Sequence, residues 1–244
     1  MDAARLEKVL ESGDKICLGN LFEYLQGIAE GLESVVRWEY REKIAGQSVR
    51  ENDLQHSYKT ALLTLICAIE ENQYRAAEDR LDLGLLCAMA LIHDISEIFE
   101  GDLFGPIKGS AERNMEMLAF EHIVSPLPRG VRKYFLYAFR QAVLGTALSI
   151  NSAESRFFNA IEKIGAVKRS LHECRLGNTH FAPKCLETEI PALQKYAIEF
   201  PSLRTLYGPY IDETIEYVNE FREQRNRYLA DFVRNGGNEN DFLL

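Results

Sequence analysis

The sequence predicts an all-α protein built as a bundle of amphipathic helices. Apolar residues recur at spacings of three and four through most of the chain, which is the period of a helix with one buried face. Alternation with a period of two, which a half-buried strand needs, does not persist anywhere. No Pro/Gly/Ser-rich linker divides the 244 residues, so we expect a single domain over 1–244.

The first predicted helix spans 18–36, where Leu, Phe, Ile and Val follow the helical period. The second begins at Asn52 and Asp53, which are good N-cap residues, and continues to about Glu71. The third runs from about Leu81 to Phe99 and is apolar on more than one face. We therefore expect a central helix that is packed on several sides, in which any polar residue is conspicuous.

Later helices follow the loop GDLFGP, whose Gly and Pro residues break the third helix. The segment 177–191 is predicted to be a loop followed by a short helix. The remaining predicted helices are 111–124, 130–144, 153–176 and 212–233.

Composition excludes several classes of protein. The 28 basic and 37 acidic side chains give a net charge of −9, without the clustered Lys/Arg surplus of a nucleic-acid-binding protein. The longest apolar runs are far shorter than the about 20 residues of a membrane-spanning helix, and the N-terminus does not resemble a signal peptide. The 5 cysteines are odd in number and show no C-x-x-C spacing, so disulfides are not expected. We expect a cytoplasmic protein with neither a membrane nor a nucleic-acid partner.

His93 and Asp94 form the most unusual pair in the chain, because they lie inside its most apolar predicted helix. A buried aspartate is costly unless it meets a cation or several donors, and a metal ion would satisfy both side chains. Glu97 follows at a spacing that places it on the same helical face. A plainer interpretation is that the pair ends a helix with solvated carboxylates. His56 at the start of the preceding helix favours the metal, since facing helices that each deliver a histidine commonly build such sites.

These residues carry a family resemblance. The pattern E-N-x-x-x-H-S at 51–57, followed by H-D-x-S-E-x-x-x-G-D-L-x-x-P-x-K at 93–108, resembles the HD-domain phosphohydrolases. It is more narrowly similar to the bacterial 5′-deoxynucleotidases. The likeness covers about 30–180, which leaves 181–244 as a C-terminal helical extension.

The resemblance implies an all-helical HD-domain bundle, usually dimeric, that uses a divalent metal to remove the 5′-phosphate of deoxyribonucleoside monophosphates. It implies His56, His93, Asp94 and a later acid as metal ligands. Glu162 stands where the family has an aspartate, so it either binds the ion with a longer side chain or pairs with a nearby Lys or Arg. Imidazole and carboxylate donors suit Mn, Co, Fe or Zn. A second departure is Gln55, where the family usually has Glu.

The other implied roles follow from hydrolysis of a phosphomonoester, which needs a positioned water and a proton for the leaving oxygen. Glu97 and Asp102 match the family's catalytic acids and are assigned jointly, although Asp102 is also a suitable turn residue. Arg37 is a planar donor for a phosphate, and Lys108 adds positive charge. Trp38 matches the position that crowds the 2′ side of the sugar, with core packing as its alternative. About four extra residues, 43–46, separate this pair from the first histidine.

Three functions stay open. The first is the metal-dependent 5′-deoxynucleotidase activity, and the second is hydrolysis of another phosphorylated nucleotide or a sugar phosphate by the same domain. The third is a nucleotide-binding protein whose Glu162 has weakened the metal site. A structural zinc site at His172, Cys174, His180 and Cys185 is disfavoured because its spacing fits no standard arrangement.

Overall fold

The protein is described by a computed structural model that defines residues 6, 10, 11, 21–37, 51–102, 110–144, 152–177 and 182–235. Within these ranges the regular elements are all helical, and the nearest approach to a sheet is an isolated antiparallel bridge between Val36 and Asn52. The prediction of an all-α fold is confirmed. No helix in the described ranges is long and apolar enough to cross a membrane.

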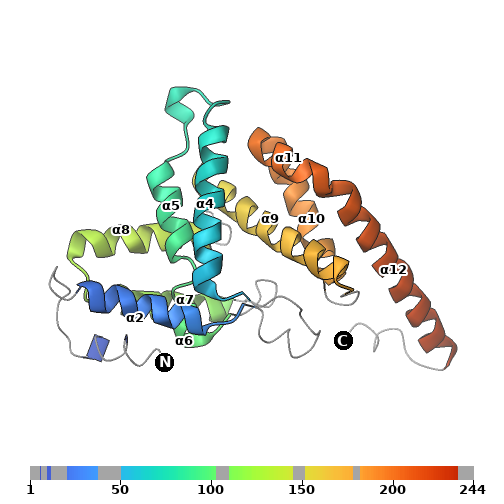
Figure 1. The fold of residues 1–244 in the computed structure, drawn as a ribbon, viewed down its shortest axis with the longest axis horizontal. Coiled ribbons are helices and arrows are strands. Elements are labelled where there is room, and N and C mark those ends of the chain that lie inside the picture. Colours follow the sequence, from blue (N-terminus) through green and yellow to red (C-terminus); the bar gives the residue numbers. More distant parts are fainter. Residues whose placement is uncertain are drawn as a thin grey trace.

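The helices form a central pair flanked by two groups (Figure 1). Helices α4 and α5 pack side by side, α9 and α10 pack against each other, and α12 runs along the outer side of that second pair. The main helices are α2 (Leu21–Ser34), α4 (Asp53–Glu71), α5 (Leu83–Ile92), α6 (Glu97–Glu100), α7 (Ser110–Val124), α8 (Arg129–Phe139), α9 (Ala153–Arg175), α10 (Ala182–Glu199), α11 (Pro201–Tyr207) and α12 (Ile211–Arg234). Short helical turns are η1 (Ala77–Asp79), η3 (Arg140–Leu144) and η4 (Gly208–Tyr210).

Side-chain caps fix the starts of the helices that build the site. Asn52 accepts a hydrogen bond from the backbone N–H of Gln55 at the start of α4. Ser152 does the same for the N–H of Ser155 at the start of α9. Each cap satisfies an N–H that the first helical turn leaves without an intrahelical partner. The predicted start of α4 is therefore confirmed.

The predicted helix over 81–99 is wrong in one respect, because α5 ends at Ile92. The backbone N–H groups of Ile95, Glu97, Ile98 and Phe99 bond three residues back, as when Glu97 N donates to Asp94 O at 2.9 Å. These tighter bonds make a turn between α5 and α6. His93 and Asp94 lie in this turn, so the break falls at the two residues that the sequence marked as unusual.

The short helix predicted within 177–191 is also wrong in its length, whereas the loop predicted before it falls on 178–181, outside the described residues. Helix α10 is 18 residues long and contains Pro191. It packs along α9 and buries Leu186 and Leu193, and this burial outweighs the backbone hydrogen bond that the proline removes. Helix α11 begins shortly afterwards, in a stretch for which the sequence predicted no helix, with Pro201 at its first position.

A buried core extends from Leu6 to Val218. Phe120 and Phe139 stack at a ring separation of 4.0 Å and join α7 to α8. Phe157 of α9 meets Phe200 edge-on at 5.1 Å. The late helices are thus packed onto the same core as α4 and α5, and this fixes α9 beside α4, where the site lies.

Candidate metal centre and phosphate pocket

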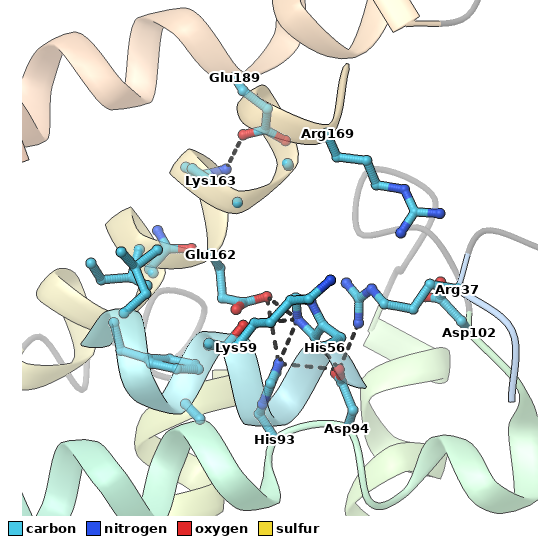
Figure 2. A pocket seen from close by; sticks show the side chains of 18 of the residues that line it. Arg37, His56, Lys59, His93, Asp94, Asp102, Glu162, Lys163, Arg169 and Glu189 are labelled. Carbon is cyan, nitrogen blue, oxygen red and sulfur yellow. Dashed lines mark hydrogen bonds and ion pairs between the residues drawn. The ribbon is translucent and has the colours of Figure 1, made fainter. Parts of the chain in front are cut away.

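Four side chains from distant parts of the chain meet in one cluster (Figure 2). The Nε2 atoms of His56 and His93 lie 3.3 Å apart. Glu162 Oε2 lies 3.4 Å from His56 Nε2 and 3.5 Å from His93 Nε2. Asp94 Oδ2 lies 3.2 Å from His93 Nε2 and 3.7 Å from His56 Nε2. The structure therefore brings together all four residues that the family resemblance implied as ligands.

Each of these side chains is held by a rigid element. His56 lies in the first turn of α4, just after the Asn52 cap. His93 caps the C-terminus of α5, and its Nδ1 lies 3.0 Å from Ala90 O, so an N–H at Nδ1 leaves Nε2 free to bind a ligand. Glu162 projects from the middle of α9, which crosses above the other two helices in Figure 2.

The donor set fits a divalent cation. Two imidazole nitrogens and two carboxylates are ligands for Mn, Co, Fe or Zn, and bonds of about 2.0–2.2 Å place neighbouring ligand atoms about 3–3.5 Å apart. The measured separations lie close to that range, from 3.2 to 3.7 Å. The second oxygen of Glu162, Oε1, is buried without a hydrogen-bond partner. A buried carboxylate that is only partly satisfied is expected where a cation belongs.

The charges of the cluster reinforce one another. Burial lowers the pKa of His93, but Asp94 and Glu162 outweigh it and hold that pKa well above its ordinary value. Burial raises the pKa of Glu162, but His93 and His56 outweigh it and lower that pKa far below its usual range. Burial also raises the pKa of Asp94, but His93 and Arg37 outweigh it and lower that pKa. Both carboxylates are therefore ionised, as ligands of a cation must be.

Arg37 approaches Asp94 at the same oxygen that faces the two histidines. Its Nη1 donates to Asp94 Oδ2 at 2.6 Å and lies 3.6 Å from Asp53 Oδ1. Backbone bonds hold it there: Arg37 N donates to Glu51 O, and Asp53 N donates to Val35 O. Burial, which lowers the pKa of Arg37, is outweighed by Asp94 and Asp102, so the guanidinium stays charged beside the cluster.

A second group of acids adjoins the first. Carboxylate oxygens of Asp53, Asp94 and Glu97 all lie within 4.8 Å of one another, and the three residues are buried. Burial and the Asp94 charge raise the pKa of Asp53 to about 8, against the influence of Arg37. Asp102 lines the same pocket. The sequence singled out Glu97 and Asp102 but missed Asp53, since an acid after an N-cap is an ordinary helix-start residue.

The cluster opens into a pocket of about 950 Å³, which is large enough for a nucleotide. Its basic side chains along α4 and α9 include Lys59, Lys163 and Arg169, none of which the sequence singled out. Lys59 and Arg169 both donate to Glu51 at 2.7 Å. Arg169 points toward Arg37 across the pocket (Figure 2). These residues were missed because only the crossing of α9 over α4 makes them neighbours.

Three of the predicted site residues, Trp38, Lys108 and His180, lie outside the described residues. Cys174 and Cys185 are buried and free, and neither belongs to a potential metal-binding group found within the described ranges. The 4 described cysteines are all free.

Comparison with known proteins identifies the family. The family model described as 5′-deoxynucleotidase YfbR-like matches residues 23–205. The chain belongs to this family. A 5′-deoxynucleotidase of Pasteurella multocida is 26% identical over 170 residues, which cover 67% of this chain and 80% of the relative. A 5′-deoxynucleotidase of Vibrio atlanticus is 21% identical over 194 residues, covering 77% and 94%.

Solved structures of HD-domain phosphohydrolases share the fold. An HD-domain phosphohydrolase from Listeria innocua matches with a TM-score of 0.64 and 17% identity over 82% of this chain and 92% of that chain. A protein from Magnetospirillum magnetotacticum, described as a predicted metal-dependent phosphohydrolase, matches with a TM-score of 0.59 and 20% identity over 82% and 96%. The resemblance to the HD-domain phosphohydrolases is thereby confirmed.

Proposed function

We propose that this YfbR-like protein is a metal-dependent phosphomonoesterase that removes the 5′-phosphate from deoxyribonucleoside monophosphates. The observation that carries the proposal is the convergence of two histidines and two carboxylates beside an arginine whose side chain is only 13% exposed. Such a site can hold a cation and a phosphate side by side. The names of the curated relatives support the same substrate class.

In this proposal His56, His93, Asp94 and Glu162 hold the divalent ion, which is Mn, Co, Zn or Fe. When bound, the ion supplies a Lewis acid for a phosphate oxygen and lowers the pKa of a water. The remaining chemistry belongs to the chain. Arg37 offers its planar guanidinium to the phosphate.

The proton transfers fall to Glu97 and Asp102 jointly. Glu97 is 3% exposed, and both residues line the pocket that contains the metal cluster. A buried carboxylate can hold the proton that the departing 5′ oxygen needs. From the family resemblance, Trp38 favours the deoxyribose and Lys108 adds positive charge for the phosphate.

The two alternatives are hydrolysis of another phosphorylated nucleotide and nucleotide binding with a weakened metal site. The alternative of a weakened metal site depends on Glu162, because this glutamate stands where the family has an aspartate. Its longer side chain still approaches both histidines to within 3.5 Å. This geometry favours a competent metal site over a weakened one.

The test is phosphate release from a panel of deoxyribo- and ribonucleoside 5′-monophosphates and other phosphorylated nucleotides, with Mn²⁺, Co²⁺, Zn²⁺ or a chelator. The proposal expects metal-dependent release that favours the deoxyribose series. Release only from other phosphorylated nucleotides would instead support the first alternative. Folded protein that binds nucleotides and releases no phosphate with any metal would support the second.

We also propose that the chain forms a homodimer through α4. One face of this helix exposes only two charges, Lys59 and Glu70, beside a row of large apolar residues. If two copies of α4 pack antiparallel, Lys59 of one copy lies opposite Glu70 of the partner, and vice versa. The apolar residues, each 38% to 64% exposed, are Leu54, Tyr58, Leu62, Ile66 and Ile69.

We extend the proposal to a cytoplasmic location, because the described cysteines are free and a reducing compartment keeps thiols in that state.

A further inference from the structure

Three nitrogen atoms approach one carboxylate oxygen of the site, Asp94 Oδ2. It faces both histidines at 3.2 and 3.7 Å, and it also accepts the 2.6 Å hydrogen bond from Arg37 Nη1. A cation bound by this oxygen would repel the guanidinium that shares it. Metal binding and the present position of Arg37 therefore compete for one carboxylate.

Asp53 is the acid to which the guanidinium can turn. Its carboxylate is 0% exposed, and its Oδ1 lies 3.6 Å from the same Nη1 that bonds Asp94. Backbone hydrogen bonds of 2.8 and 3.1 Å join 35–37 to 51–53 and so hold Arg37 beside Asp53. A small rotation of the Arg37 side chain would exchange one carboxylate for the other.

The need for such an acceptor follows from burial. The Arg37 side chain is only 13% exposed, so a guanidinium displaced from Asp94 would lose a charge partner in a region with little water. Both carboxyl oxygens of Asp53 are buried without a hydrogen-bond partner, so the displaced guanidinium can bond to them and stay in the pocket. It is then available to an anionic group of the substrate.

We propose that Asp53 is a positioning residue that receives Arg37 when Asp94 binds a metal ion, and so keeps the guanidinium in place for the phosphate. The role in holding the phosphate rests on the proposed function. The first part of the proposal, that Asp53 receives Arg37 when a metal ion binds, does not depend on it. Nothing in the sequence pattern of the motif distinguishes this acid from an ordinary helix-start residue.

The decisive experiment is a titration of metal-free protein with Mn²⁺, followed by calorimetry, in a double-mutant cycle. The four proteins are the wild type, Asp53→Asn, Arg37→Gln and the double variant. We expect Asp53→Asn alone to weaken Mn²⁺ binding about tenfold, in the range typical of residues that act through a ligand. In the Arg37→Gln background the same change should have less than a twofold effect, because no guanidinium needs a new partner.

Two results would overturn the proposal. An equal loss in both backgrounds would mean that Asp53 acts through its own charge and not through Arg37. No loss in either background would mean that it does not act on the metal site. Glu116→Gln, which removes another buried acid lining the pocket, is the matched control and should show no dependence on Arg37. Circular dichroism checks the folding of each variant, and Asp53→Ser replaces Asp53→Asn if the latter unfolds.

A kinetic measurement tests the second part of the proposal, that Asp53 keeps Arg37 in place for the phosphate. At saturating Mn²⁺, Asp53→Asn should raise the KM for a hydrolysed monophosphate several-fold more than it lowers kcat, and Asp53→Glu should restore part of the loss. A fall in kcat with an unchanged KM would refute a role in holding the phosphate. If the wild type hydrolyses no nucleotide, the proposed function fails, while the Mn²⁺ cycle still decides whether Asp53 acts through Arg37.

Discussion

At the scale of single residues, burial controls the chemistry of the thiols. Burial raises the pKa of Cys67 to about 11 and that of Cys174 to about 12. Because the thiolate is the reactive form, both should react slowly with a thiol reagent at pH 8 in the folded protein and quickly after unfolding. Peptide mapping of the labelled sites measures this, with the less buried Cys87 as the internal reference. Equal labelling of all three in the native state would contradict the burial.

The residues of the site were predictable only where they carry a local pattern. His93 and Asp94 stand out as polar residues in an apolar run, and His56 follows an N-cap. Asp53 and Arg169 have no such signal. Their neighbours, Arg37 and Glu51, lie far away in sequence and become partners only when the helices pack.

At the scale of elements, Glu71 joins the end of α4 to the start of α11. Its Oε2 accepts from Ser202 N at 3.1 Å and from Ser202 Oγ at 2.7 Å, and Arg75 Nε lies 3.2 Å from Oε1. Glu71→Ala leaves these buried donors without an acceptor, so we expect a loss of about 2–4 kcal/mol in the free energy of unfolding. Urea denaturation measures it. The control is Glu78, an exposed acid in η1: Glu78→Ala should change stability by less than about 0.5 kcal/mol, and equal effects would contradict the assignment.

Glu51 joins α4 to α9 through Lys59 and Arg169, and this link should depend on pH. Burial raises the pKa of Glu51, but the hydrogen bond from Lys59 and the charge of Arg169 outweigh it, so the pKa is lowered. A lowered pKa adds stability above the carboxyl's ordinary pKa, and that stability is lost as the pH falls through the folded-state value. Glu51→Gln should thus destabilise the protein at pH 7, and the difference from wild type should shrink below about pH 4. Urea titrations of metal-free protein at both pH values test this, and a gap that widens in acid would contradict it.

The sequence predicted most helices but misjudged two, for physical reasons. The apolar run 81–99 concealed the end of α5, because hydrophobicity does not report the change from four-residue backbone bonding at His93 to three-residue bonding at Ile95. The short helix predicted within 177–191 is instead the 18-residue α10, which packing against α9 sustains through Pro191. Both errors arise where tertiary contacts override local preference.

At the scale of the whole molecule, we infer that 1–244 is one domain. The core that begins at Leu6 continues without a break to Val218 of α12. Helices of the C-terminal extension also line the pocket, since Thr188, Glu189 and Tyr196 of α10 contribute to its wall. Limited proteolysis should therefore release no stable fragment that ends near residue 180, and the appearance of one would contradict this inference.

The proposed dimer has a direct test. Leu62→Glu combined with Ile66→Glu places four like charges at the centre of the antiparallel α4 pair, so the assembly should dissociate to monomers in light scattering coupled to gel filtration. Ile198→Glu, at an apolar residue of α10 that is 85% exposed, is the matched control and should leave the assembly unchanged. A wild-type monomer, or a dimer that survives the α4 changes, would contradict the interface.

We propose that His56, His93, Asp94 and Glu162 together form one metal site. The most direct measurement is a calorimetric titration of metal-free protein with Mn²⁺, for the wild type, Glu162→Ala, Glu162→Asp and the rim control Glu189→Ala, which removes an acid paired with Lys163. We expect about one ion per chain, a loss of affinity of at least about 100-fold in Glu162→Ala, a smaller loss in Glu162→Asp and little change in the control. Mn²⁺ binding in Glu162→Ala as tight as in the wild type would contradict it.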